Sequence, residues 1–578
     1  MIPLSEPADL ARACRTCRMF YYMCLPNLYS HVKLKSYDHV RISPETARPE
    51  GCGMGSPFVM GLNALAIRPV AQYVKEFEVI GQYKEPGAED YAGVGRVADG
   101  AMMANILVRA AIDRMPLLHT FNWSLNIKML SVVWETLVQK NTLTTLKIKF
   151  PTERMPSPIY TVPAMPYLKS LTVYDIDPLC FPDNLQTLFH ESLNIEYLTM
   201  HWSPRMRRER ETSTNLHMYF GKIWSATKKM KLKSLAMQNL YCLGQQGNFL
   251  GIYDPAYLES MTAIDATGGA DDDANVSFVV EPPKRLAPMP RLRALRGNKV
   301  SRPNCDGLKK MAPLQRYFLI SGRELHDDRT PSNSRTGSVA SPGSQISDSQ
   351  RGGLFYDGPR SVVGTPQSHG EHRVSPPSVS GSNPFAAAST PSSMSDTPII
   401  NLGRDYIDNI FKHHGATLTH LLLLPQWRLT SKDIRMLTIN CKKIEQLGMG
   451  LEDSSFDTLQ SIIPNMRRLR ALRILDPPAN WAGMDGANGS PRAEDEWYEE
   501  KISDQTWQAG WDVLKWLGLG SQVFELLARE RVSPIANDNS DNDDMDAEDS
   551  TRRRVVKRPL SAVREIDIWK LDKKTIVF

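Results

Sequence analysis

Three cysteines near the start of the chain are the residues whose type and spacing come closest to a chemical site. Cys14, Cys17 and Cys24 give the spacing C-x2-C-x6-C, and thiolates at that spacing could share one tetrahedral zinc ion. Completing such a site would need another C-x2-C pair and a further cysteine soon after, but the next cysteines are Cys52 and Cys180. The alternative is that the three thiols pack as small core residues of a helix. We therefore predict no metal site and no cofactor.

Catalytic motifs are also missing from the rest of the sequence. The chain contains no G-x-S-x-G, no H-E-x-x-H and no Walker loop, which are the commonest short patterns for nucleophilic, zinc and phosphate chemistry. Its histidines are scattered, and the adjacent pair His413 and His414 would point in different directions along a helix. We predict that the protein is not an enzyme.

Length and charge limit the class of protein further. With 578 residues the chain is too long for one compact core, so several domains or one elongated repeat array are expected. The net charge of +5 is small for this length, which argues against a nucleic-acid partner. The sequence shows neither a signal-peptide pattern at its start nor a run of about 18 apolar residues anywhere. We expect no membrane partner and a cytoplasmic or nuclear location.

A recurring apolar signature predicts the elements that would position a binding site. Leu143, Leu146 and Ile148 form the pattern L-x-x-L-x-I, which recurs 25 and then 27 residues later, and apolar residues take helical spacing between copies. One copy cannot bury its apolar edge alone, but stacked copies form a continuous core. We therefore predict an α/β solenoid with parallel strands on a concave face and helices on a convex face. The copies begin at Val74, Leu118, Leu143, Leu168, Ile195, Leu232, Leu292, Leu314, Leu418, Ile444 and Leu469.

The copies fall into two blocks, 67–322 and 401–578, separated by a segment of different composition. Residues 323–400 are dominated by Ser, Pro, Gly and Thr, which bury too little apolar surface to offset the entropy of ordering, so we predict a disordered insertion. Phosphorylation before proline would add negative charge there, although a plain spacer explains the composition equally well. The candidate phosphosites are Thr330, Ser341, Thr365, Ser375, Thr390 and Thr397.

The end of the second block departs from the repeat pattern. A Trp-rich amphipathic stretch with Trp507, Trp511 and Trp516 predicts a helical insertion that packs as a cap on the repeat core. The acidic and basic loop 534–559 contains Arg552–Arg558, either a nuclear-import signal or an ordinary charged loop. Val563, Ile566 and Ile568 then predict a final strand.

A second pattern lies in residues 1–37, where D-L-x6-C-x2-F is followed by L-P-x-L-Y. Its residues are Asp9, Leu10, Cys17, Phe20, Leu25, Pro26, Leu28 and Tyr29. The pattern resembles the second half of an F-box in the form common in fungal proteins, and residues 38–66 would then be a linker. The resemblance implies docking on a Skp1-like adaptor. The family's first helix has no counterpart here, so either preceding sequence is missing or Skp1 binding is weakened or lost.

Side chains between the apolar positions of each strand point away from the core and offer a binding surface. Strands stacked about 4.8 Å apart would join these side chains into one concave sheet, whose hydroxyl, aromatic and basic groups suit a protein partner. The candidate residues are Thr145, Lys147, Lys149, Ser170, Thr172, Tyr174, Tyr197, Thr199 and His201.

The strand-and-helix repeats resemble the leucine-rich repeat, and this resemblance together with the F-box-like start implies a function. A monomeric chain of this kind would be a substrate-recognition adaptor of a Skp1-cullin-F-box ubiquitin ligase, holding the protein to be ubiquitinated. Two alternatives stay open. One is a leucine-rich-repeat scaffold unconnected with ubiquitin, and the other is a transcription regulator, because Cys14, Cys17 and Cys24 also match the first half of a fungal zinc-cluster motif.

Overall fold

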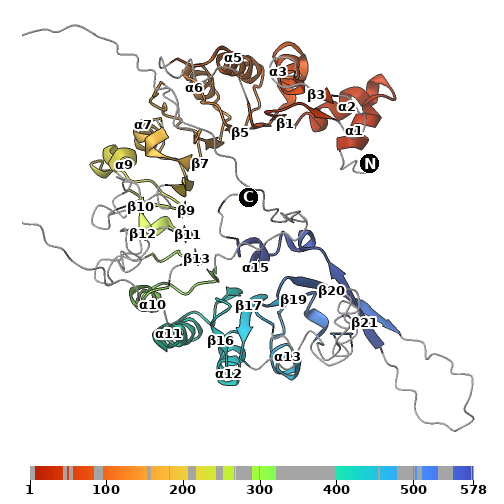
Figure 1. Ribbon diagram of the computed structural model, residues 1–578, viewed down its shortest axis with the longest axis vertical. Coiled ribbons are helices and arrows are strands. Elements are labelled where there is room, and N and C mark those ends of the chain that lie inside the picture. The colour runs from red at the N-terminus through yellow and green to blue at the C-terminus, as the bar shows by residue number, and fades with distance from the viewer. Residues whose placement is uncertain are drawn as a thin grey trace, which may run out of the picture. The chain divides into compact units, whose positions relative to one another are not determined.

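The computed structural model shows a mixed α/β chain built on one large, open and mostly parallel sheet (Figure 1). Residues 1–325 and 397–578 form one compact unit. The structure describes residues 7–42, 49–50, 56–83, 96–152, 158–180, 183–205, 217–242, 252–265, 267–268, 289–298, 300–320, 397–452, 456–477, 499, 502–503, 511–531, 551–573 and 576.

Seventeen strands make up the large sheet, and neighbours in sequence are neighbours in space. Pairing is parallel from β1 to β19, and β20 and β21 close the end as antiparallel strands. The strands in spatial order are β1 (His31–Ser36), β4 (Glu76–Gly81), β5 (Thr120–Leu125), β6 (Thr145–Lys149), β7 (Ser170–Ile176), β8 (Tyr197–Trp202), β9 (Ser234–Gln238), β11 (Ser260–Ile264), β13 (Ala294–Gly297), β14 (Arg316–Leu319), β15 (His420–Leu422), β17 (Gln446–Leu451), β18 (Ala471–Ile474), β19 (Trp516–Leu519), β20 (Gln522–Arg531) and β21 (Thr551–Arg558), with β16 (Arg428–Leu429) beside β17. Short pairs outside this sheet are β2 (Arg41–Ile42) with β3 (Pro49–Glu50) and β10 (Tyr241–Cys242) with β12 (Thr267–Gly268).

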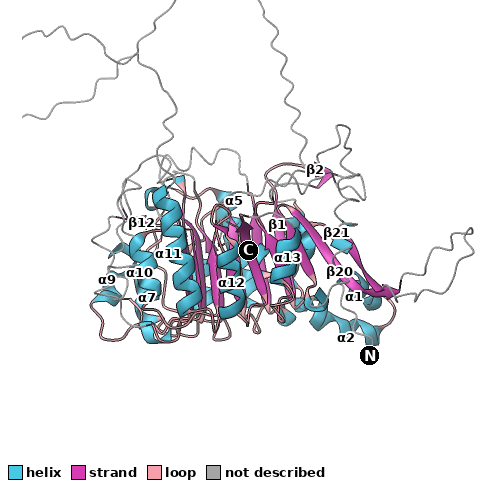
Figure 2. Cartoon of the chain, turned by 90° about the horizontal axis from the view of Figure 1, so that it is seen from below, coloured by secondary structure: helices cyan, strands magenta, loops and turns pink. Residues whose placement is uncertain are grey.

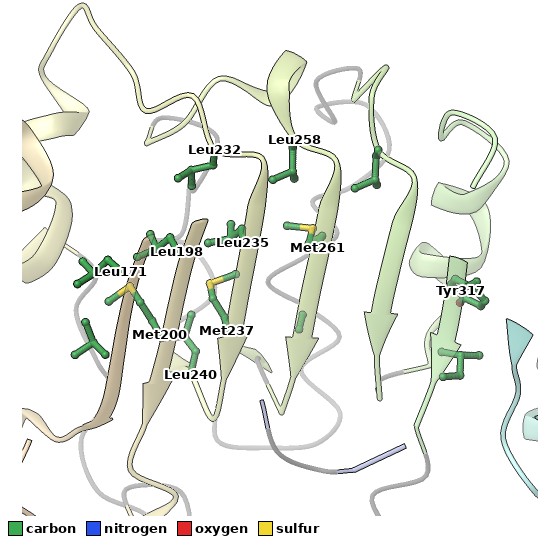
Figure 3. Packing of buried hydrophobic residues seen from close by; sticks show 14 of the residues in the cluster. Leu171, Leu198, Met200, Leu232, Leu235, Met237, Leu240, Leu258, Met261 and Tyr317 are labelled. Carbon is green, nitrogen blue, oxygen red and sulfur yellow. The ribbon is translucent and has the colours of Figure 1, made fainter. Parts of the chain in front are cut away.

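The apolar signature forms the core because its residues meet in register on one face of the sheet. Leu171, Leu198, Leu235 and Met261 lie side by side on successive strands, and Figure 3 shows them in one row. All four are buried, and burying a side chain of this size stabilises the fold by about 1.5–3 kcal/mol. Parallel strands lie at every predicted copy, and β11 is an additional one.

Helices cover the core side of the sheet, as Figure 2 shows for α11, α12 and α13 in front of the strands. The predicted alternation of strand and helix is therefore confirmed at this level. The helices are α1 (Pro7–Cys14), α2 (Arg18–Leu28), α3 (Pro57–Ile67), α5 (Asp99–Asp113), α6 (Ser131–Val138), α7 (Gln186–Glu191), α9 (His217–Trp224), α10 (Arg302–Leu308), α11 (Thr397–His413), α12 (Ser431–Asn440), α13 (Phe456–Ile462) and α15 (Asp567–Lys570). Short 3-10 turns occur at Pro69–Tyr73, Pro178–Cys180, Pro255–Tyr257, Trp511–Val513 and Leu560–Val563.

The two blocks of repeats join directly across the segment 323–400. Strand β14 pairs in parallel with β15, and Arg316 lies opposite His420 although about a hundred positions separate them in sequence. Five of the candidate phosphosites, Thr330, Ser341, Thr365, Ser375 and Thr390, lie outside the described residues, and Thr397 is the first residue of α11.

The expected linker 38–66 is wrong for its last part. Helix α3 begins at Pro57, where the Ser56 hydroxyl accepts a hydrogen bond from the Val59 amide at 3.3 Å and caps the first turn. Phe58 and Leu62 of this helix are buried in the main core. The helical spacing of apolar residues in 57–67 indicated this helix, and it should have outweighed the Gly and Pro content that suggested a linker.

The end of the chain also differs from prediction. The Trp-rich stretch is not one helix, because Trp516 begins the strand β19, while Trp511 is buried in a short 3-10 turn. Arg552–Arg558 is neither a loop nor wholly exposed, since it lies in β21. The expected final strand at Val563–Ile568 is instead a 3-10 turn followed by α15.

Candidate functional site

One row of residues crosses the sheet on the face opposite the core and forms the candidate binding site. Each member lies between the second and third apolar positions of its strand and is paired in register with the next. We call it the outer row. Its members are Lys33, Glu78, Asn122, Lys147, Thr172, Thr199, Ala236, Thr262, Arg296, Phe318, Leu422, Gly448, Arg473 and Gly518.

The half of the outer face that β1 and β4–β8 provide is open to solvent, and we call it the open half. The side chain of Lys149 is 39% exposed, and Tyr197 is 46% exposed. All nine predicted concave-face residues lie on this half. Thr172 departs from the expectation of an accessible surface, because it is 9% exposed between its row neighbours Lys147 and Thr199.

A polar cluster stands at the end of β7 and β8 on the open half. The Asp175 backbone N–H donates to His201 Nδ1 at 3.3 Å, and the Asp175 carboxylate lies 3.2 Å from that nitrogen and 3.4 Å from the Lys149 ammonium. Asn239 Nδ2 lies 3.2 Å from the other ring nitrogen of His201, and the His201 ring packs edge-on against Tyr174. Each of these side chains therefore holds its neighbour in one orientation.

Charge within this cluster favours an ionised carboxylate. Burial alone would raise the pKa of Asp175, but its hydrogen bond to His201 and the charges of His201 and Lys149 outweigh burial and lower that pKa. Asp175 also adopts a left-handed backbone with φ of 54°, which Asp and Asn tolerate better than most residues. Sequence reasoning identified Lys149, Tyr174 and His201 but missed Asp175 and Asn239. The signal was a polar residue at the end of a strand, because Asp175 is the last but one residue of β7 and Asn239 follows β9 directly.

The half of the outer face that β13–β19 provide is covered, and we call it the covered half. Its row members Arg296, Phe318, Leu422 and Arg473 are all at most 4% exposed. Residues 563–573 and Ile576 lie over them and form a separate apolar cluster that includes Phe318, Leu422 and Trp569. In Figure 1 the helix α15 lies on the side of β17 and β19 that faces away from α12 and α13.

At the other end of the sheet, the F-box-like residues divide between core and surface. Leu10 and Leu25 are buried, whereas Phe20 and Cys17 are exposed. Pro26 lies inside α2, which continues to Leu28. Asp9 pairs with Arg12 at 3.0 Å, and Leu28 and Tyr29 are half-buried.

Helix α2 presents an uninterrupted run of exposed apolar side chains. Met19 is 69% exposed and Tyr22 66% exposed, and Phe20, Tyr21 and Met23 are also exposed. A patch of this kind marks an interaction surface more often than a free surface. Of these five residues, only Phe20 was predicted to be a binding residue.

The early cysteines do not gather into a metal site. Cys17 is exposed at the start of α2, while Cys14 lies beside Cys24. Burial is the larger cause that raises the pKa of Cys14, and the neighbouring Cys24 thiol is the smaller one. Within the part of the chain that the structure describes, no three His, Cys, Asp or Glu side chains are placed to hold one metal ion. No described helix has the length and apolar character that crossing a membrane requires.

No protein-family model and no curated protein matches the chain.

Proposed function

We propose that the chain is a leucine-rich-repeat-like solenoid that acts as a protein-binding adaptor of a Skp1-cullin-F-box ubiquitin ligase. In this proposal α1 and α2 dock on a Skp1-like adaptor, and the open half of the outer face holds the protein to be ubiquitinated. The chain itself would supply no reacting group. It would act by bringing its bound protein close to the partner enzymes, because proximity alone can supply a large part of a rate enhancement.

The observation that carries this proposal is the exposed apolar run Met19–Met23. It lies on the same helix as half of the F-box-like residues, and β1 follows that helix and joins it to the sheet. One chain thus offers two separate surfaces, an apolar one on α2 and a mixed polar one on β5–β8. Two surfaces of different chemistry on one compact unit are what an adaptor between two proteins requires.

Capture of Skp1 by the full-length chain tests the proposal. We expect purified Skp1 to be retained, and we expect the double variant Phe20→Asp with Tyr22→Asp to lose it, because two charges would stand in an apolar contact. The matched control is Met436→Asp with Ile439→Asp, which places two charges on exposed apolar positions of α12. Retention by the control and loss in the α2 variant would support the proposal.

The opposite results would contradict it. If the wild-type chain retains no Skp1, the ubiquitin assignment fails and the scaffold alternative takes its place, because the open half of the outer face does not depend on α2. Equal retention by both double variants would place any Skp1 contact away from α2.

A further inference from the structure

The covered half of the outer face is built to recognise a peptide, and the chain's own end shows which peptide. Two arginines of the outer row bind the backbone of residues 568–573. Arg296 donates to the carbonyl oxygens of Leu571 and Lys573 at 2.9 and 2.6 Å, and Arg473 donates to the carbonyl oxygen of Ile568 at 3.1 Å. These contacts hold the backbone of α15 and of the residues that follow it without using their side chains.

Amide side chains of the sheet add contacts of the same kind at two further points. Gln446 accepts from the Ile568 amide at 3.3 Å, and Gln238 accepts from the Ile576 amide at 2.8 Å. Two carboxylates of the segment fix its position along the sheet. Asp572 pairs with Arg473 at 2.8 Å, and Asp567 lies 3.7 Å from Arg316.

Glycines of the outer row make room for the apolar side chains of the segment. A Cβ atom at Gly518 would lie 2.6 Å from the Trp569 ring, so only glycine lets the indole reach the sheet. At Gly448 a Cβ atom would lie 2.4 Å from Leu422 Cδ1, while Ile568 Cβ is 3.9 Å away and in ordinary contact, so this glycine makes room for Leu422 of the sheet beside Ile568. Ile568 and Trp569, which we call the two anchors of the segment, therefore lie next to glycines of the outer row.

The two arginines come from one repeated hexapeptide. R-L-R-A-L-R occurs at 291–296 and again at 468–473, and its last arginine enters the outer row each time. Buried charges rarely stabilise a fold better than apolar residues of the same size would. Arg473 Nε and Trp569 Nε1 also lack hydrogen-bond partners among the described residues. A face that served only as core would not need this chemistry.

The main core is complete without the segment. Apolar contacts of residues 563–573 and Ile576 form their own cluster, separate from the continuous core on the helix side of the sheet. The segment also adds no strand to the sheet. Its removal would uncover a groove and would leave the strand and helix layers unchanged.

We infer that the covered half is a peptide-binding groove that residues 563–573 and Ile576 fill in cis, and that it accepts a segment of a partner protein with the same chemistry. The ligand contains an aliphatic residue followed by an aromatic one. One carboxylate directly precedes this pair, and a second carboxylate lies three residues after the aromatic residue, as in Asp567-Ile568-Trp569-Lys570-Leu571-Asp572. This inference deepens the proposed protein-binding role, but its test involves no Skp1, so either can fail alone.

A synthetic peptide of residues 559–578 with a fluorescent label tests the inference on full-length protein. The variant Ile568→Asp with Trp569→Ala removes both anchors from the cis segment and opens the groove. We expect the peptide to bind this open variant at least about tenfold more tightly than the wild type, whose groove is occupied most of the time. Adding Arg473→Ala should abolish binding, whereas adding Lys147→Ala on the open half should leave it unchanged.

A peptide carrying Asp572→Asn checks recognition of the carboxylate and should bind the open variant more weakly. Equal binding of the labelled peptide to wild type and open variant would overturn the inference, as would a folded open variant that binds no peptide. If the open variant has no cooperative thermal transition with or without saturating peptide, residues 563–576 are an integral part of the fold and the inference is wrong.

Discussion

The two halves of the outer face belong to one continuous sheet and differ in the side chains that the sheet carries. From Lys33 to Thr199 the outer row is polar or charged and meets solvent, with Thr172 the exception, whereas from Arg296 to Gly518 it is apolar, glycine or buried arginine. The pairing register continues unbroken between them. A repeat can therefore keep one core and change its binding chemistry along the array, because core and outer positions alternate in each strand.

The largest effect should come from breaking the covered half at Arg473. Arg473→Ala leaves Asp572 buried without its main partner, and removing one member of a buried pair costs about 3–5 kcal/mol. Chemical denaturation measures this change. Lys147→Ala, at the equivalent row position of the open half, is the control and should stay within about 0.5 kcal/mol of wild type. Similar losses in both variants would remove the distinction between the halves.

A smaller loss should follow from filling the space at Gly518. Gly518→Val places a side chain against the Trp569 ring and the Arg473 stem, and overpacking of this kind costs about 1–3 kcal/mol. Thermal unfolding followed by Trp fluorescence reports both stability and the indole's surroundings. Thr199→Val adds no such contact on the open half and serves as the control. An unchanged Trp569 signal in Gly518→Val would contradict the placement of the segment.

On the open half, Asp175 should give a pH-dependent effect of up to about 1 kcal/mol. Its pKa in the folded protein lies below the ordinary value of about 3.9, so the carboxylate stabilises the fold at neutral pH, and this contribution is lost as the pH falls through the folded pKa. Asp175→Asn keeps the left-handed backbone accessible and removes the charge. The difference in unfolding free energy between wild type and variant should shrink in acid, and a difference that does not change with pH would contradict the Asp175–His201 pairing.

The smallest effect on stability should come from Lys147→Glu, within about 0.5 kcal/mol. If the open half holds a protein, this charge reversal should weaken capture of that protein without moving the melting temperature. Co-purification of bound proteins with wild type and variant measures it, with Lys432→Glu on the helix side as control. A partner bound equally by all three would lie outside the open half.

Sequence periodicity predicted the strands well because their apolar residues repeat at fixed spacing in one continuous core. It missed β11, where Ala263 is small for the third apolar position. It also could not tell a strand from a covering segment, because Val563, Ile566 and Ile568 show the strand spacing while packing from the opposite side. Additional apolar residues at outer positions, such as Phe318 and Leu422, were the available signal that something covers this half.

Hydroxyl-radical footprinting of the intact chain compares the two halves most directly. Tyr197, 46% exposed on the open half, and Trp569, 4% exposed on the covered half, both carry reactive rings. The account predicts rapid oxidation of Tyr197 and protection of Trp569, with protection lost in Arg473→Ala. Rapid oxidation of Trp569 in the wild-type protein would contradict the division of the sheet into an open and a covered half.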